Sequence, residues 1–262
     1  MTDPDQSAPW PRPYWRASAE KAVLHFYVFG KFAPELSIPA PRYGSPGLPA
    51  GVTIERFQNA VLRRWEGYPL FGELGAILRE ETPEAYDDAR VAPEVLVVRG
   101  QLDDADTLDY LRDTLGVLAA LLDIGATSIL DPQMLRLFTA ADWRGHYLIK
   151  GGAPARNHVL ILCNADEERT DRSWVRTRGM RKFARPDISI HNIPERDLDR
   201  AGVLCERLVE LQSLGAHLDA DKPLELDGLP SALVARPGGS MSDPHFNNTH
   251  VAFRWPDQAL PD

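Results

Sequence analysis

The segment from Trp174 to Asp187, WVRTRGMRKFARPD, carries the most concentrated positive charge of the chain. Between Arg172 and Arg185 there are six basic residues and no acidic one. Guanidinium groups bind carboxylates and phosphates through paired hydrogen bonds. The segment therefore predicts a ligand-binding site for an anion, with these residues as its candidates: Arg176, Arg178, Arg181 and Arg185.

The spacing within this segment indicates how the side chains are arranged. If the segment is extended after Trp174, Arg176 and Arg178 lie on one face, and Val175 and Thr177 lie on the other. A glycine follows at position 179 and permits a turn. The later basic side chains would then approach the same region from beyond that turn.

An alternative explanation is internal pairing. The whole chain has a net charge of −9, which leaves −15 for the residues outside the basic segment. Carboxylates are therefore abundant, and a nearby run includes Asp166, Glu167 and Glu168. We therefore expect the arginines to pair with such groups, with binding of a ligand or partner as the alternative.

A second polar segment, DPHFNNTH, contains three side chains of metal-ligating type: Asp243, His245 and His250. Pro244 and the asparagines at 247–248 disfavour a helix, and the spacing of the histidines matches no rigid ligand geometry. We therefore expect a polar turn and no metal, with these residues as the alternative metal ligands.

His191 is the candidate for acid–base catalysis closest to the arginines. It follows Ile188 and Ile190 in strand alternation, so it should lie on the opposite face together with Ser189. We expect a structural role, with catalysis as the alternative. No phosphate-binding glycine loop, nucleophile elbow or zinc-protease motif occurs, and we expect no cofactor.

The composition restricts the partners of the protein. Its acidic balance disfavours nucleic acid and anionic membranes, and its longest apolar run, starting at Ala22, is too short for a membrane span. We expect a cytoplasmic protein, since its N-terminus lacks a signal-peptide pattern. We expect Cys163 and Cys205 to be buried and without a disulfide.

The order of elements predicts an α+β fold, with helices packed on a mixed or largely antiparallel sheet. We expect a loosely ordered leader over 1–16 and a single compact domain over 17–257, with a split near 151–152 as the alternative. The predicted strands are 22–29, 95–98, 126–130, 158–163, 187–190, 232–235 and 249–255. The predicted helices start at Thr53, at Asp103 or Asp104, at Thr139 and at Pro194.

Four segments in the C-terminal part of the chain resemble a bacterial family that carries a domain of unknown function. They are Leu162–Glu168, Trp174–Ile190, Glu206–Ala216 and Ser242–Trp255. The resemblance implies no activity, cofactor or catalytic residue. At Ala184 the family usually has glycine before Arg-Pro-Asp, so the tight turn there is in doubt.

Two function classes fit this sequence. The first is a non-enzymatic binding protein, such as a regulator, an immunity-type inhibitor or an accessory of a larger system. The second is an enzyme or sensor for a small anionic ligand. We favour the first, with a protein partner or a small anion as the bound species.

Overall fold

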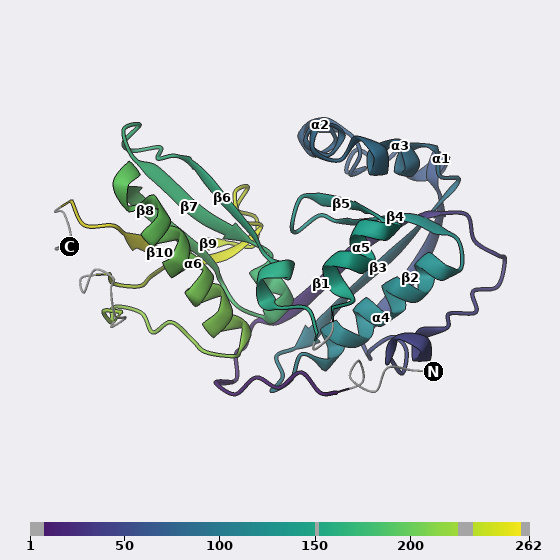
Figure 1. Ribbon diagram of the computed structural model, residues 1–262, viewed down its shortest axis with the longest axis horizontal. Coiled ribbons are helices and arrows are strands. Elements are labelled where there is room, and N and C mark those ends of the chain that lie inside the picture. The colour runs from purple at the N-terminus through teal and green to yellow at the C-terminus, as the bar shows by residue number, and fades with distance from the viewer. Residues whose placement is uncertain (1–7, 150–151, 225–232, 258–262) are drawn as a thin grey trace.

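Two five-stranded sheets form the framework of the computed structural model, which describes residues 8–149, 152–224 and 233–257 (Figure 1). The first sheet has the order β2 (Val52–Gln58), β3 (Glu94–Asp103), β1 (Lys21–Gly30), β4 (Ala126–Asp131) and β5 (Arg136–Thr139). All of its neighbouring strands are antiparallel. Its central strand β1 is rich in β-branched and aromatic residues, which suit a strand buried on both faces.

The second sheet has the order β6 (Leu160–Ala165), β7 (Ser173–Arg178), β8 (Asp187–Ile193), β10 (Asn248–Arg254) and β9 (Arg236–Ser240). Its neighbours are antiparallel except for β8 and β10, which run parallel. The predicted α+β class with largely antiparallel pairing is therefore confirmed, although the strands divide between two sheets.

Helices cover these sheets (Figure 1). On the first sheet, α4 (Asp109–Asp123) and α5 (Ala140–Tyr147) pack on one face, while α2 (Gly72–Glu81) and α3 (Pro83–Val91) pack on the other. Helix α6 (Leu198–Ser213) packs against β7 and β8 of the second sheet. The short helical segments are α1 (Asn59–Leu62), η1 (Ala40–Tyr43), η2 (Ala155–His158), η3 (Met180–Phe183) and η4 (Glu195–Asp197).

One buried cluster connects the two sheets. It includes Phe26 of β1, Leu118 of α4, Ile190 of β8 and Leu208 of α6, each at most 1% exposed. A second cluster lies between the first sheet and the pair α2–α3. The sheets thus share one core, and whether the chain forms one domain or splits near 151–152 stays a prediction.

Several predicted elements are confirmed because local sequence decided them. The leucines that recur at helical spacing in α4 are buried: Leu111, Leu115, Leu118 and Leu122. Thr139 caps α5 by accepting a hydrogen bond from the Asp142 amide. Helix α6 is followed by Gly215, whose φ of 98° is the left-handed conformation that commonly ends helices. The predicted cap of α4 at Asp103 or Asp104 is wrong, because β3 runs to Asp103 and the helix starts at Asp109.

The helix predicted from Thr53 is wrong. Residues 52–58 form strand β2, which pairs with β3, and only the short helix α1 follows. Ile54 packs on one core cluster and Phe57 on the other, as residues three apart on a strand must do. Their helix-like spacing was coincidental, because pairing with β3 overrode the local preference.

Other boundaries also differ from the predictions. The strand predicted over 158–163 is β6, shifted toward the C-terminus, and Cys163 on this edge strand is exposed, whereas Cys205 is buried; both are free thiols. Ala232 lies outside the described residues, and the next three residues form only an isolated bridge at Val234. Four further elements were not predicted from the sequence: α2, α3, β5 and β9.

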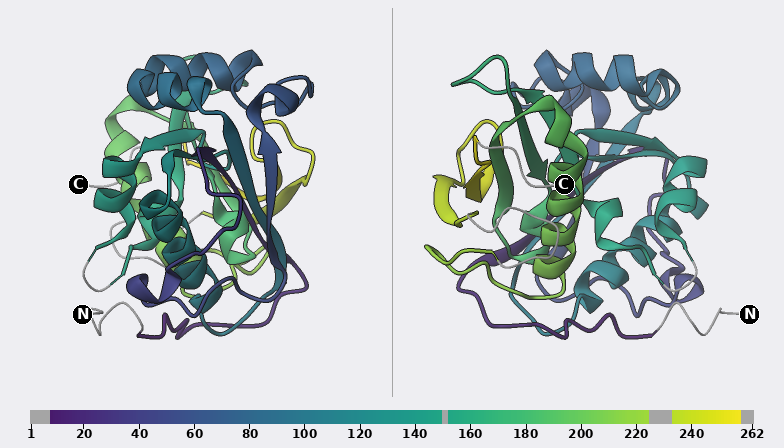
Figure 2. Two further views of the ribbon diagram at one scale, coloured as in Figure 1. Left: turned by 90° about the vertical axis from the view of Figure 1, so that its right-hand side faces the viewer. Right: turned by 60° about the vertical axis from the view of Figure 1, so that its left-hand side comes forward.

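The segment from residue 8 to 16 runs along the body of the protein (Figure 2). Its Arg12 is 3% exposed and donates to the carbonyls of Ala105, Phe183 and Ser213. This part of the expected loose leader is therefore anchored, while residues 1–7 lie outside the described residues.

Helices of the described residues are all too short or too polar to cross a membrane.

Candidate functional site

Strand β7 places two of the predicted arginines side by side on one face. Val175 and Thr177 are 2% and 0% exposed, whereas Arg176 and Arg178 are partly exposed. The predicted alternation is therefore confirmed. The apolar face is covered by α6, whereas the loop before β10 contacts Arg178 through the His245 carbonyl.

A tight turn after β7 brings a third arginine, Arg181, to the same loop that Arg178 contacts. Gly179 has a φ of 116°, and a Cβ atom there would lie 2.5 Å from the His158 carbonyl oxygen. The chain then forms η3, which carries Arg181 and ends at Ala184 with a φ of 52°. The tight turn at Ala184 therefore forms with alanine, in a conformation that costs a non-glycine residue about 1–2 kcal/mol.

The guanidiniums of Arg176, Arg178 and Arg181 are here called the arginine face. Among the described residues, their hydrogen bonds go to backbone or amide oxygens. Arg176 donates to the Asn164 side chain at 2.7 Å. Arg178 donates to the carbonyl of His245 at 2.7 Å, and Arg181 to that of Asn247 at 3.0 Å. Within the described residues, no carboxylate forms an ion pair with any of the three.

Each of the three guanidiniums also has a buried donor without a partner. The Nε atoms lack hydrogen-bond partners in the described part of the chain. Burial lowers the pKa of all three side chains, and for Arg176 the charge of Arg178 lowers it further. Carboxylates such as Asp187 and Asp243 partly oppose this lowering without forming ion pairs, so an incoming anion would stabilise the arginine face further.

Aromatic rings around Trp174 pack against Arg176 of the arginine face. The guanidinium of Arg176 lies 4.1 Å from the ring centroid of Trp174, a cation–π contact. His191 stacks on the same indole at 5.1 Å, and His245 meets it edge-on at 5.2 Å. The structure thus brings the loop before β10 next to the arginines.

His191 is held between two polar side chains. Its Nε2 lies 2.9 Å from the Ser189 hydroxyl, and its Nδ1 lies 3.4 Å from the Asp166 carboxylate. The three side chains Ser189, His191 and Asp166 are arranged like the nucleophile, base and orienting acid of a hydrolase. Ser189 is only 1% exposed, however, and its hydroxyl accepts a hydrogen bond from Trp174. A substrate could not reach that oxygen without displacing the indole.

The segment before β10 forms the expected polar turn. Asp243 accepts a hydrogen bond from the His245 amide, and its backbone carbonyl accepts one from Asn247. The His245 ring lies near Glu167, whereas His250 packs on Phe246 at 4.3 Å. Over residues 8–149, 152–224 and 233–257, no three His, Cys, Asp or Glu side chains gather as metal ligands.

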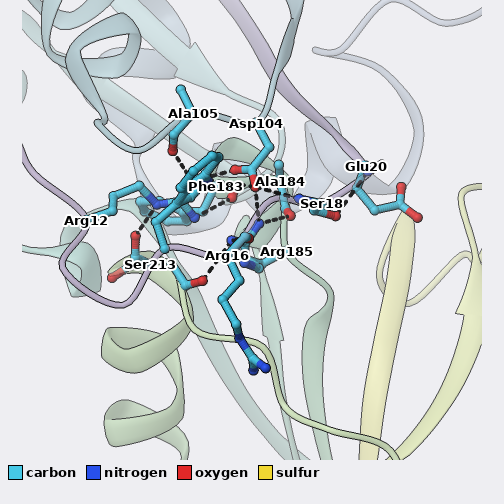
Figure 3. A network of polar contacts seen from close by, with 12 residues as sticks. Arg12, Arg16, Ser18, Glu20, Asp104, Ala105, Phe183, Ala184, Arg185 and Ser213 are labelled. Carbon is cyan, nitrogen blue, oxygen red and sulfur yellow. Dashed lines mark hydrogen bonds and ion pairs between the residues drawn. The ribbon is translucent and has the colours of Figure 1, made fainter.

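Arg185 is not part of the arginine face, which corrects its prediction as a ligand-binding residue. Its side chain is 1% exposed and donates to Asp104 at 2.9 Å. Arg12 lies on the other oxygen of the same carboxylate, at 2.5 Å (Figure 3). Internal pairing thus explains Arg185 but not the arginine face.

Asp187 lies buried behind the arginines. It is 0% exposed and accepts hydrogen bonds from Thr177 and Asn248. Burial raises the pKa of Asp187 to about 6, although these hydrogen bonds and the charge of Arg178 oppose the rise. The carboxyl therefore becomes neutral in mildly acidic solution, which leaves the positive charge of the arginine face less compensated.

Sequence reasoning missed two contributors to this site. Trp174 was predicted to have no role beyond starting the basic segment, although a residue two positions before Arg176 on a strand shares its face. Asn164 lies just beyond the strand predicted over 158–163 and was given no role. Its register opposite Trp174 follows from the pairing of β6 with β7, which no local pattern reveals.

No known protein family matches the chain, and no curated protein or solved structure is significantly similar to it. The resemblance to a bacterial family with a domain of unknown function stays a prediction.

Proposed function

We propose that this protein is a non-enzymatic binding protein, a cytoplasmic regulator or accessory whose arginine face docks a carboxylate-rich segment of a protein partner. The observation that carries this proposal is the absence of any ion pair on Arg176, Arg178 and Arg181 within the described residues. In an acidic chain, three cations that form no ion pair with a carboxylate of the described residues favour an external anion.

The spacing of the arginines favours an extended acidic segment over one small anion. Arg176 and Arg178 are two residues apart on one strand, so their Cα atoms are separated by about 7 Å. Alternate residues of an extended peptide have the same separation. Two carboxylates of such a segment could therefore each meet one guanidinium.

The expected result of replacing Arg176 by glutamine is weaker binding of an acidic peptide. The probe is a fluorescein-labelled peptide of alternating glutamate and serine, titrated while its anisotropy is followed. Loss of one charge-assisted contact should raise the Kd at least about tenfold. Arg90→Gln on α3 is the matched control, since Arg90 is exposed and paired with Asp87 away from this face.

Equal binding by both variants, or no binding by the unaltered protein, would contradict the proposal. Binding of sulfate without binding of the peptide, measured as a rise in Tm, would instead favour the small-anion alternative.

The affinity for this peptide is expected to increase as the pH falls from 8 to 5.5. Asp187, whose pKa is raised to about 6, loses its negative charge across this range, which strengthens the field of Arg178 and Arg181. Glutamates of the peptide, with a pKa of about 4.3, stay ionised. Anisotropy titrations at the two pH values test this; an affinity that falls or stays constant would exclude Asp187 as a modulator.

The enzyme alternative rests on the contacts of His191 with Ser189 and Asp166. Because the Ser189 hydroxyl is buried beneath Trp174, we expect no reaction with a fluorophosphonate probe. Covalent labelling that Ser189→Ala abolishes would favour a hydrolase instead.

A further inference from the structure

A cavity of about 670 Å³ has none of the three arginines of the arginine face in its lining. It is bounded by the N-terminal segment around Trp10, the start of α4, the residues 152–158 and the outer side of α6. Small-molecule sites in proteins typically have about 300–1,000 Å³. The cavity is therefore large enough for a ligand of two or three rings.

The wall formed by the N-terminal segment is fixed in place. The Trp10 amide donates to the Asp109 carboxylate at 2.9 Å, and the Trp10 carbonyl accepts from the Leu108 amide at 2.8 Å. The indole lies close to Gly152, where a Cβ atom would be 2.9 Å from the ring. A preformed wall lowers the entropic cost of binding a ligand.

The lining of the cavity is mainly apolar. It includes Trp10, Leu108, Pro154, Phe183 and Leu214, and Val203 of α6 contributes a side chain from a residue that is 48% exposed. Apolar walls of this kind bind apolar molecules through burial of their surface.

Charged residues of the cavity are balanced. The lining has two arginines, Arg156 and Arg207, and two glutamates, Glu206 and Glu210. Arg156 forms an ion pair with Glu206 at 3.3 Å. His158, which also lines the cavity, is buried, and burial lowers its pKa well below the usual range, so its imidazole is neutral. The cavity therefore offers no net charge that would select an ionic ligand.

We propose that this cavity binds an uncharged, largely apolar small molecule, at a site separate from the arginine face. The ligand would lie between the indole of Trp10 and the outer side of α6, near Val203. This proposal does not depend on the proposed binding of an acidic partner.

The test uses N-phenyl-1-naphthylamine, an uncharged fluorescent probe, titrated into the full chain. Saturable binding at one site per chain is expected. Val203→Trp fills the cavity from an exposed position and should raise the Kd at least about tenfold. Val61→Trp is the matched control, because Val61 is 59% exposed on α1 and does not line the cavity.

Two further measurements sharpen the result. The sulfonated analogue 1-anilinonaphthalene-8-sulfonate has the same rings and one negative charge, and it should bind less tightly than the neutral probe. Leu214→Trp, on the same cavity, should repeat the effect of Val203→Trp.

Absence of saturable binding, or equal Kd values for Val203→Trp and Val61→Trp, would overturn the proposal. Arg176→Gln should leave probe binding unchanged, which separates this test from that of the arginine face.

Discussion

Replacing Asp104 by alanine is expected to lower the free energy of unfolding by about 3–5 kcal/mol. The Asp104 carboxylate lies between Arg12 and Arg185, and all three side chains are at most 1% exposed (Figure 3). Removing it leaves two buried guanidiniums facing each other without a counter-charge. Such an uncompensated charge is far more costly than the loss of an exposed ion pair.

The same carboxylate also anchors the N-terminal segment. One of its oxygens accepts hydrogen bonds from the Trp15 indole and the Ser18 amide, both at 3.0 Å. We therefore expect Asp104→Ala to expose residues 8–16 to proteolysis as well. Urea unfolding measures the global effect, and limited proteolysis measures the local one.

Asp103→Ala is a control at the neighbouring position. Its side chain is 89% exposed and pairs with Lys21 at the surface, so the free energy of unfolding should change little. Similar losses in the two variants would show that the buried network does not stabilise the fold.

The pH dependence of the free energy of unfolding is a second test of the role of Asp104. Burial would raise the pKa of Asp104, but hydrogen bonds from Arg185 and Arg12 outweigh it and lower the pKa below its usual value. The stabilisation by this carboxylate is thus present above about pH 3.9 and lost as the pH falls through the lowered pKa. Asp104→Ala should lack this part of the acid sensitivity.

Replacing Lys182 by methionine is expected to destabilise the protein by a similar amount, about 3–5 kcal/mol. Lys182 of η3 and Asp131 of β4 are both 0% exposed, with Nζ 2.5 Å from the carboxylate Oδ2. The ammonium also donates to the His158 carbonyl at 2.9 Å. Its removal leaves the Asp131 charge buried where the second half of the chain meets the first sheet. Chemical denaturation measures the loss.

The double variant Lys182→Met/Asp131→Asn separates charge from packing. Asparagine keeps the Oδ1 atom that accepts the Gln133 and Met134 amides but carries no charge. We expect it to recover part of the stability, and equal losses in the single and double variants would exclude an uncompensated charge as the cause. Lys222→Met, at an exposed pair with Asp219, should have little effect.

Local sequence determined the parts of this protein that depend on neighbours along the chain. Alternation in β7 separated Arg176 and Arg178 from Val175 and Thr177, and the hydroxyl of Thr139 marked the start of α5. These features follow from the two-residue period of a strand and from the unpaired amides of a helix start. Both are readable without knowledge of the fold.

Tertiary structure decided which arginines are paired. Arg181 and Arg185 are four residues apart in one basic segment, yet among the described residues only Arg185 meets a carboxylate, that of Asp104, 81 residues away in sequence. Likewise, pairing with β3 turned the helix-like spacing after Thr53 into a strand. The energy of a charge depends on the groups that folding places around it, and local sequence does not specify contacts between distant segments.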